Sequence, residues 1–325
     1  MKQLIIGTRG SPLALNQANE VKERILSNFN IKVKIKVVKT EGDIDLSTPS
    51  RKILDKGFYT SEIEQLLNDS KIDLAVHSMK DLPLKLKSQF EISAVMKRRS
   101  PMDILITNRF SKLKDFPSNS TIGVGSLRRR LQLKLIRPDL QIVDVRGNIE
   151  TRINKMYKYN WHGLIIAKAA LERLKLKEKF IDFNIKQMIP ASCQGIVAVE
   201  SLKNRSELKS ITSKINHPQT YLNGLIEREI ALILEGGCKI PVGCYADVNN
   251  DKVNLYAYIA TDSGEKFIIE TESGLLEDKK EIINSLIKKM NKKGLQEILN
   301  DRSPSVNWIN FCQFICCSWN NFVAA

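Results

Sequence analysis

Cys238 lies in a short loop whose composition suits reaction at a thiol. The run 234–243 reads Leu-Glu-Gly-Gly-Cys-Lys-Ile-Pro-Val-Gly and follows apolar residues at helical spacing. Gly236 and Gly237 fit the left-handed end of a helix, and Pro241 prevents the helix from resuming. Two glycines beside a thiol let a bulky group approach the sulfur without a side-chain clash. An isolated cysteine after a helix can equally be a small buried residue, so the loop alone leaves both interpretations open.

Asp81 is a candidate acid–base group. It follows Lys80 and precedes Pro83, beyond an apolar stretch at 72–76 that is expected to form a strand. A positioned carboxylate can accept N–H hydrogen bonds, stabilise a developing cation and transfer a proton. The alternative is that Asp81, like most isolated Asp residues, is a cap or a solvated group. His77 ends the same apolar stretch, where a structural histidine is the commoner case, and we assign it no role.

A set of arginines gives the chain a means of binding carboxylates. Most of them lie just after an expected strand, where a helix begins. Guanidinium groups bind carboxylates through two parallel hydrogen bonds, and helix N-termini add a favourable dipole for anions. Any one arginine could instead form a surface salt bridge, but the repeated position after strands favours a common anion site. The set comprises Arg9, Arg128, Arg129, Arg146, Arg152 and Arg173.

The elements that would position these groups alternate between strand and helix. Ser11 is a good helix N-cap, Pro12 suits the first helical turn, and Ser61 to Glu64 spells a capping box. Such alternation favours an α/β fold with largely parallel sheets, which bind ligands beyond the carboxyl ends of their strands. In this first part we expect strands at 2–7, 31–38 and 72–76, helices at 12–28 and from 61, and a loop at 41–57.

A second α/β segment and a smaller third unit follow. The pattern changes around 95–101 and around 189–199, which indicates two crossings between units. Pro218 marks the start of a helix that leads to the cysteine loop, with Leu225 and Ile226 on its apolar face. We expect strands at 104–107, 121–124, 141–145 and 164–167, with helices after the last three, then strands at 253–260 and 266–271 and helices at 278–291 and 295–300.

The composition fits a globular protein of two or three domains with an acidic partner. The chain has 325 residues, 42% of them hydrophobic, and a net charge of +15. This charge indicates nucleic acid, an anionic membrane or a small polyanion, although a lysine-rich surface could account for part of it. No apolar run reaches the ~18 residues of a membrane span, and we expect no signal peptide. Six Cys without framework spacing indicate reduced thiols, as in a cytoplasmic protein.

Several motifs occur together in the order typical of one enzyme family. Besides the cysteine loop they are Thr8-Arg9-Gly10-Ser11-Pro12-Leu13-Ala14-Leu15, Lys56-Gly57, His77-Ser78-Met79-Lys80-Asp81-Leu82-Pro83, Ser126-Leu127-Arg128-Arg129, Arg146-Gly147-Asn148, and Pro190-Ala191 with Gln194-Gly195. Over roughly 4–299 the sequence resembles porphobilinogen deaminase, also called hydroxymethylbilane synthase. The resemblance implies a transferase that condenses four porphobilinogen molecules head to tail with loss of ammonia. It then releases hydroxymethylbilane by hydrolysis for tetrapyrrole (haem) biosynthesis.

The resemblance also implies roles for individual residues. Asp81 would be the catalytic carboxylate, and Cys238 would carry a dipyrromethane cofactor through a covalent thioether, with no metal. The loop at 41–57 would be a lid, in or next to which Lys52, Lys56 and Tyr59 meet the growing product. The implied cofactor-binding residues are Lys80, Ser126, Arg128, Arg129 and Gln194, and the implied substrate-binding residues are Arg9, Ser11, Arg146, Arg152 and Arg173.

The implied fold is α/β, with two periplasmic-binding-protein-like α/β domains joined by hinge crossings and a small α+β C-terminal domain that carries the cofactor cysteine. We expect the domains at 1–96 with 196–213, at 100–192 and at 217–302, with a strand near 196–200 rejoining the first. The tail at 303–325 is rich in Cys, Trp and Phe and has no assigned role. The expected partners are porphobilinogen and the next tetrapyrrole enzyme, with no nucleic acid, no membrane and a monomeric state.

Some residues depart from the family pattern, and two other functions stay open. Val124-Gly125 precedes Ser126 where hydroxyl residues are common, and Cys193 places a second thiol near the cleft. One rival is a two-lobed binding protein for an anionic ligand, which would need neither Cys238 nor Asp81. The other is a nucleic-acid-binding protein. An aromatic content of 6% and arginines that follow separate strands disfavour it.

Overall fold

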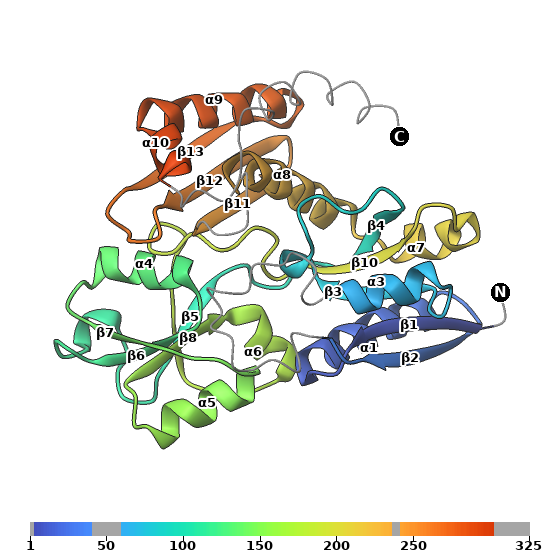
Figure 1. Cartoon of the computed structure of the whole chain (residues 1–325), viewed down its shortest axis with the longest axis horizontal. Helices are drawn as coiled ribbons and strands as arrows, with labels where there is room; N and C mark the ends of the chain where they lie inside the picture. The colour runs from blue at the N-terminus through green and yellow to red at the C-terminus, as the bar shows by residue number, and fades with distance from the viewer. Residues whose placement is uncertain (1–2, 41–59, 236–240, 302–325) are drawn as a thin grey trace.

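The computed structural model describes residues 3–40, 60–235 and 241–301. Within these ranges the chain forms three sheets, each with its own helices (Figure 1). The first sheet lies at the right of that view, the second at the lower left, and the third above the second. None of the described helices combines the length and hydropathy needed to cross a membrane.

The first sheet carries the strand ends that were expected to bear Arg9 and Asp81. Its order is β2-β1-β3-β10-β4, in which β1, β2 and β3 are parallel and β10 is antiparallel to both neighbours. Helices α1 and α7 pack on one face and α3 on the other, because both faces are apolar. The elements are β1 (Gln3–Arg9), α1 (Pro12–Leu26), β2 (Lys32–Val38), α3 (Ser61–Asn68), β3 (Leu74–Ser78), η2 (Met79–Asp81), β4 (Phe90–Val95), β10 (Val197–Leu202), η4 (Ser206–Leu208) and α7 (Lys209–Ile215).

Local sequence signals explain one helix start in this sheet and miss another. The hydroxyl of Ser11 accepts a hydrogen bond from the backbone N–H of Ala14 at 3.3 Å, which confirms the predicted cap of α1. The capping box predicted at Ser61 is wrong. Because α3 begins at Ser61 itself, that residue cannot be the cap, and the hydroxyl of Thr60 donates instead to the carboxylate of Glu64 at 2.9 Å.

The second sheet confirms the four strands expected there and adds a short fifth, β9. Its order is β7-β6-β8-β5-β9, with β6, β7 and β8 parallel and β5 antiparallel to β8 and β9. Because β5 runs the opposite way, its first residue, Asp103, lies opposite Ala167 at the edge where β8 ends. The elements are β5 (Asp103–Ile106), η3 (Leu113–Asp115), β6 (Thr121–Val124), α4 (Leu127–Ile136), β7 (Gln141–Asp144), α5 (Ile149–Lys158), β8 (Gly163–Ala167), α6 (Lys168–Leu174) and β9 (Phe180–Asp182).

Two chain crossings connect these sheets and are hydrogen-bonded to each other. The outgoing crossing joins β4 to β5 and the returning crossing leads from the second sheet into β10. The backbone N–H of Arg99 donates to the carbonyl of Gly195 at 3.2 Å, and that of Met96 donates to the carbonyl of Val197 at 3.0 Å. Strand β10 therefore returns to the first sheet beside β4, as expected for a strand near 196–200. Gly195 has a φ of +89°, and a Cβ there would lie 2.5 Å from the carbonyl oxygen of Arg99.

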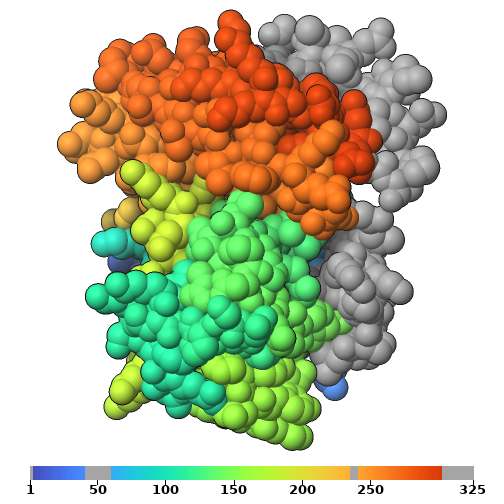
Figure 2. All heavy atoms as spheres, turned by 90° about the vertical axis from the view of Figure 1, so that its left-hand side faces the viewer, coloured from blue at the N-terminus to red at the C-terminus, as the bar shows by residue number. Residues whose placement is uncertain are grey.

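The third sheet is an antiparallel meander, β11-β12-β13, that rests on the second unit. Helices α8 and α9 cover one face, and Tyr258 on the other face packs against Leu131 of α4 and Ile189. Figure 2 shows this unit, in orange, stacked on the second unit, in green. Leu225, which was expected on the apolar face of α8, is exposed. The elements are α8 (Pro218–Glu235), β11 (Val242–Asn249), β12 (Lys252–Ala260), β13 (Phe267–Leu275), η5 (Leu276–Asp278), α9 (Lys279–Lys292) and α10 (Leu295–Asn300).

Gly195→Ala should destabilise the protein more than Gly294→Ala. Both glycines have φ values near +90°, so each alanine incurs the left-handed penalty of about 1–2 kcal/mol. Only at Gly195 would the new Cβ also meet a backbone oxygen, whereas the nearest atom at Gly294 is 3.5 Å away on a side chain. Urea denaturation of both variants measures the difference. Equal losses of unfolding free energy would show that the two crossings are not closely packed at Gly195.

Candidate active site

A pocket at the carboxyl ends of β1 and β3 brings Asp81 together with Arg9 and Ser11. These strands are parallel neighbours, so the residues that follow them meet at one edge of the sheet. The η2 turn is anchored by the backbone N–H of Met79, which donates to the carbonyl of Ile196 at 3.0 Å. Within the described ranges the carboxylate of Asp81 is exposed and has no hydrogen-bond partner. It is free to accept N–H groups of a ligand.

His77 also lines this pocket, but it is buried and faces Glu200 of β10. Its Nε2 atom lies 3.2 Å from the carboxylate of Glu200, whose side chain is fully buried. This buried pair is consistent with a structural histidine.

Gln194 joins the residues of the first sheet to those of the second. Its side-chain oxygen accepts from the ammonium of Lys80 at 3.4 Å and from Nη2 of Arg129 at 3.3 Å. Its side-chain nitrogen donates to the carbonyl of Pro101 at 2.7 Å and to Asp103 at 2.8 Å. Three residues predicted from sequence to bind cofactor therefore meet at the buried amide of Gln194. Lys80 comes from the first sheet's unit, Arg129 from the second sheet's unit, and Gln194 from the returning crossing.

Asp103 neutralises part of the charge of the two neighbouring arginines. Arg128 donates to Oδ2 of Asp103 at 2.8 Å and to the carbonyl of Ile189 at 2.6 Å. The Nε of Arg129 donates to Oδ1 at 3.0 Å. Burial by itself would raise the pKa of the Asp103 carboxyl, but the two guanidinium groups outweigh it and hold that pKa at about 2. The carboxylate is therefore ionised at every physiological pH.

The side chain of Lys80 keeps contact with solvent although it lies close to the buried arginines. Partial removal from water, together with the guanidinium groups of Arg129 and Arg128, lowers its pKa to about 8. The carboxylates of Asp81 and Asp103 act in the opposite direction. A lysine whose pKa lies this close to neutrality gains charge stabilisation when an anionic ligand binds beside it.

The residues after β6 and β7 form a second group of donors. Ser126 precedes α4, and within the described ranges its hydroxyl has no hydrogen-bond partner. A Cβ on Gly125 would lie 2.6 Å from the carbonyl oxygen of Val145 and 3.1 Å from Nη1 of Arg152, so the missing side chain lets both groups approach. Arg152 also donates to the carbonyl of Gly147 at 2.7 Å. Arg146 lies at the end of β7 and is half-buried.

Arg173 is placed differently from the other predicted ligands of substrate. It is 6% exposed, and its Nε donates to Glu20 of α1 at 3.1 Å. Its Nη2 donates to the carbonyl of Gly195 at 3.1 Å. The guanidinium group thereby links α6 to the first unit and to the returning crossing, so its substrate-binding role stays a prediction.

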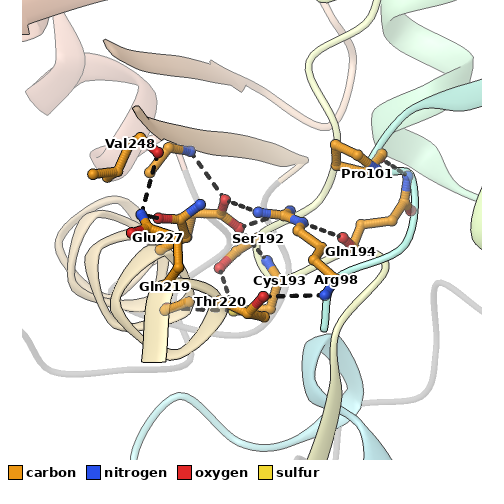
Figure 3. Close-up of polar contacts among 12 residues, drawn as sticks. Arg98, Pro101, Ser192, Cys193, Gln194, Gln219, Thr220, Glu227 and Val248 are labelled. Atoms are coloured by element: carbon orange, nitrogen blue, oxygen red, sulfur yellow. Dashed lines mark hydrogen bonds and ion pairs between the residues drawn. The ribbon is translucent and has the colours of Figure 1, made fainter. Parts of the chain in front are cut away.

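A second buried carboxylate, Glu227 of α8, ties the third unit to both crossings (Figure 3). It accepts from Arg98 at 2.5 Å, from the backbone N–H of Cys193 at 2.6 Å and from that of Ala246 at 3.0 Å. Arg98 in turn donates from Nε to the carbonyl of Gln194 at 2.9 Å. The helix that leads toward Cys238 is thus fixed to the segment that carries Gln194.

The cysteine loop lies outside the described residues. Cys238 stands in the sequence between the end of α8 and the start of β11. Lys52, Lys56, Tyr59 and the tail at 303–325 likewise lie outside the described residues. Cys193, which was expected near the cleft, is 1% exposed. Burial and the carboxylate of Glu227 raise the pKa of its thiol to about 12, which makes it unreactive at neutral pH.

Sequence reasoning missed Asp103 and Glu227, although both left a signal. Asp103 opens the strand Asp-Ile-Leu-Ile, where an acidic residue among apolar ones indicates a buried partner. Glu227 directly follows Leu225 and Ile226 in the sequence, inside a helix expected to be amphipathic. Neither signal names the partner, because the guanidinium groups come from positions at least 25 residues away in the chain.

The donor set fits a dipyrromethane, which carries several carboxylates. Among the described residues, Nη1 of Arg129 and the hydroxyl of Ser126 have no hydrogen-bond partner, and Lys80 has only one long contact. Such donors, held in place and only partly used, suit carboxylate oxygens. In the same part of the chain no three His, Cys, Asp or Glu side chains cluster as metal ligands would.

The sequence matches two family models. One is described as porphobilinogen deaminase, dipyromethane cofactor binding domain, over residues 4–210, and the other as porphobilinogen deaminase, C-terminal domain, over 221–292. A porphobilinogen deaminase of Syntrophomonas wolfei is 43% identical over 82% of this chain and 88% of its own. One of Clostridium novyi is 38% identical over 86% and 95%.

Solved structures add a more distant likeness. A probable amino-acid ABC transporter extracellular-binding protein of Bacillus subtilis is 13% identical over 71% of this chain and 97% of its own, with a TM-score of 0.42. That score is too low to support an inference about function. The family models and the two deaminases, which together cover most of the chain, are decisive: the chain belongs to the porphobilinogen deaminase family.

Proposed function

We propose that the chain condenses four porphobilinogen molecules head to tail, with loss of ammonia, onto an enzyme-bound dipyrromethane and then releases hydroxymethylbilane by hydrolysis. Family membership supports the reaction. One structural observation supports its location. The free carboxylate of Asp81 borders a pocket with Arg9, while the adjoining Lys80 belongs to the Gln194–Arg129 cluster. A carboxylate that can stabilise a cation thus lies next to basic side chains that can bind carboxylates.

Asp81 would act on the ring of the incoming porphobilinogen. When ammonia leaves from the protonated aminomethyl group, the positive charge spreads over the pyrrole, and a carboxylate nearby stabilises it. The ring N–H can donate to that carboxylate, which has no competing partner within the described ranges. The ring carbon that forms the new C–C bond then loses its proton, and the carboxylate is placed to accept it. Each addition thereby releases one ammonia and one proton.

The basic residues would bind the acetate and propionate groups of the pyrroles. Arg9 and Ser11 line the Asp81 pocket and suit the substrate, while Arg146 and Arg152 follow strand β7 of the second sheet. When bound, dipyrromethane supplies the free ring carbon on which chain growth starts. Its binding would fall to Cys238, through a thioether, and to Lys80, Ser126, Arg128, Arg129 and Gln194.

Further parts of the proposal rest on the resemblance alone. They are a monomeric state, a cytoplasmic location and transfer of the product to the next tetrapyrrole enzyme.

Asp81→Asn should retain cofactor and substrate binding but turn over slowly. Loss of a positioned acid–base group typically lowers the rate about 10²–10⁴-fold. Steady-state ammonia release from porphobilinogen measures the effect, with Asp69→Asn as the control. Asp69 is also a surface carboxylate but pairs with Lys71, away from the pocket. Turnover near that of the unmodified protein would remove Asp81 from the mechanism.

Cys238→Ser should give folded protein without a pyrrole adduct. The structure describes two other cysteines, Cys193 and Cys244. Both are buried, so their thiols cannot replace that of Cys238. Peptide mass mapping of the unmodified and variant proteins locates the adduct. An adduct on Cys193, on Cys244 or on a cysteine of the tail would contradict the assignment.

Arg152→Lys should impair chain growth although it conserves charge. The planar fork that donates to Gly147 and passes Gly125 is lost with the guanidinium group. Lys177→Gln combined with Lys179→Gln removes two exposed charges and should change little, because surface charges are screened beyond about 8–10 Å. Kinetics and the mass ladder of enzyme–pyrrole species compare the two. Equal damage would mean that long-range attraction, not local binding, governs the reaction.

A further inference from the structure

We propose that Asp103 is a positioning residue of the Gln194 cluster, whose carboxylate fixes the guanidinium groups of Arg128 and Arg129 and the amide of Gln194. By doing so it determines which donors are left for an anionic ligand. The identity of that ligand rests on the proposed function, whereas the positioning does not.

The fold places Asp103 at the carboxyl ends of the parallel strands of the second sheet. Strand β5 is antiparallel to β8, and Asp103 pairs with Ala167, the last residue of β8. Strand β6, which lies beside β8, ends at the same edge and leads into Ser126 and α4. The two arginines at the start of α4 therefore project over the first residue of β5. Only the antiparallel direction of β5 brings its beginning, rather than its end, to this edge.

Asp103 acts through its neighbours because no ligand can reach it. The residue is 0% exposed, and this chain occupies both of its carboxylate oxygens. Oδ1 accepts from Arg129 at 3.0 Å and from Gln194 at 2.8 Å, while Oδ2 accepts from Arg128 at 2.8 Å. Three side chains from α4 and the returning crossing are thus oriented by one group.

The contacts decide which N–H groups remain. Each guanidinium group has five N–H donors. Arg129 directs Nε toward Asp103 and Nη2 toward Asp103 and Gln194, which leaves Nη1 without a partner among the described residues. Rotation of this guanidinium group would exchange those donors. The carboxylate therefore selects the face of Arg129 that a ligand meets.

The charge of Asp103 also affects Lys80. Two guanidinium groups and one carboxylate leave this buried cluster with a net charge of +1, and Lys80 contacts it through Gln194 at 3.4 Å. The charged groups around Lys80 are Asp81, Arg129, Asp103 and Arg128. The two carboxylates raise the pKa of Lys80 and the two guanidinium groups lower it. Removing the Asp103 charge must therefore lower the pKa of Lys80 below its present value of about 8.

A matched pair of substitutions separates position from charge. Asp103→Asn keeps the size of the side chain and removes its charge, whereas Asp103→Glu keeps the charge and displaces the carboxylate by one methylene. Asp73→Asn is the control. Asp73 also accepts hydrogen bonds from an arginine (Arg205) and a backbone N–H, but it directly precedes the start of β3, whereas Asp81 follows the end of that strand.

Two readouts apply to the purified, cofactor-loaded proteins. The first is the pH dependence with which an amine reagent labels Lys80, quantified by peptide mass. The second is the separation of KM from kcat for porphobilinogen. We expect the labelling midpoint to fall in Asp103→Asn and to stay near that of the unmodified protein in Asp103→Glu and Asp73→Asn. We expect KM to rise about tenfold or more in both Asp103 variants and not in Asp73→Asn.

A purely structural role for Asp103 gives a different result. Both variants would then lose thermal stability while the folded fraction kept an unchanged KM, and this would overturn the proposal. An unchanged labelling midpoint in Asp103→Asn would contradict the effect of the Asp103 charge on Lys80. If Asp103→Asn does not fold, Asp103→Glu decides alone, because an unchanged KM in that variant contradicts positioning. A protein without deaminase activity would refute the proposed function, while the labelling midpoints would still test the effect of Asp103 on Lys80.

Discussion

The ion pairs of Asp103 with Arg128 and Arg129 are the interaction on which the basic cluster depends. Two guanidinium groups with 5% and 6% exposure lie side by side, and without a counter-charge their burial and mutual repulsion would be strongly unfavourable. One fully buried carboxylate between them makes the arrangement stable and also fixes its geometry. Gln194 extends the cluster to Lys80, next to the candidate catalytic Asp81. The polar interior thus links the residues of one sheet to those of the other.

A second buried carboxylate performs the same task for the third unit. Glu227 binds Arg98 of the outgoing crossing and the backbone of Cys193 in the returning one (Figure 3). The two anchors meet at Gln194, whose backbone carbonyl bonds Arg98 and whose side chain bonds Asp103. The returning crossing at Cys193 and Gln194 therefore fixes the position of α8 together with that of Arg128, Arg129 and Lys80. Gly195, with its positive φ, lets the two crossings approach at this point.

Local patterns in the sequence predicted most strands and helices, because amphipathic periodicity and caps such as Ser11 act within a few residues. Errors arose where two adjacent residues could both cap a helix. Ser61 was predicted to be the N-cap of α3, but the helix begins at Ser61 and the N-cap residue is Thr60. The partners of Asp103 and Glu227 could not be predicted, since they depend on strand direction and on contacts between distant segments. Roles for Cys238 and the arginines came from family motifs, and those roles, like the domain boundaries, stay predictions.

An experimental structure of the cofactor-loaded protein would test this arrangement most directly. The decisive distances join the carboxylates of the bound pyrroles to Nη1 of Arg129 and to the ammonium of Lys80. We expect both to be within hydrogen-bonding range, with the bonds from Arg128 and Arg129 to Asp103 unchanged. Pyrrole carboxylates bound elsewhere, or a guanidinium group of Arg129 that has turned away from Asp103 to reach them, would contradict it.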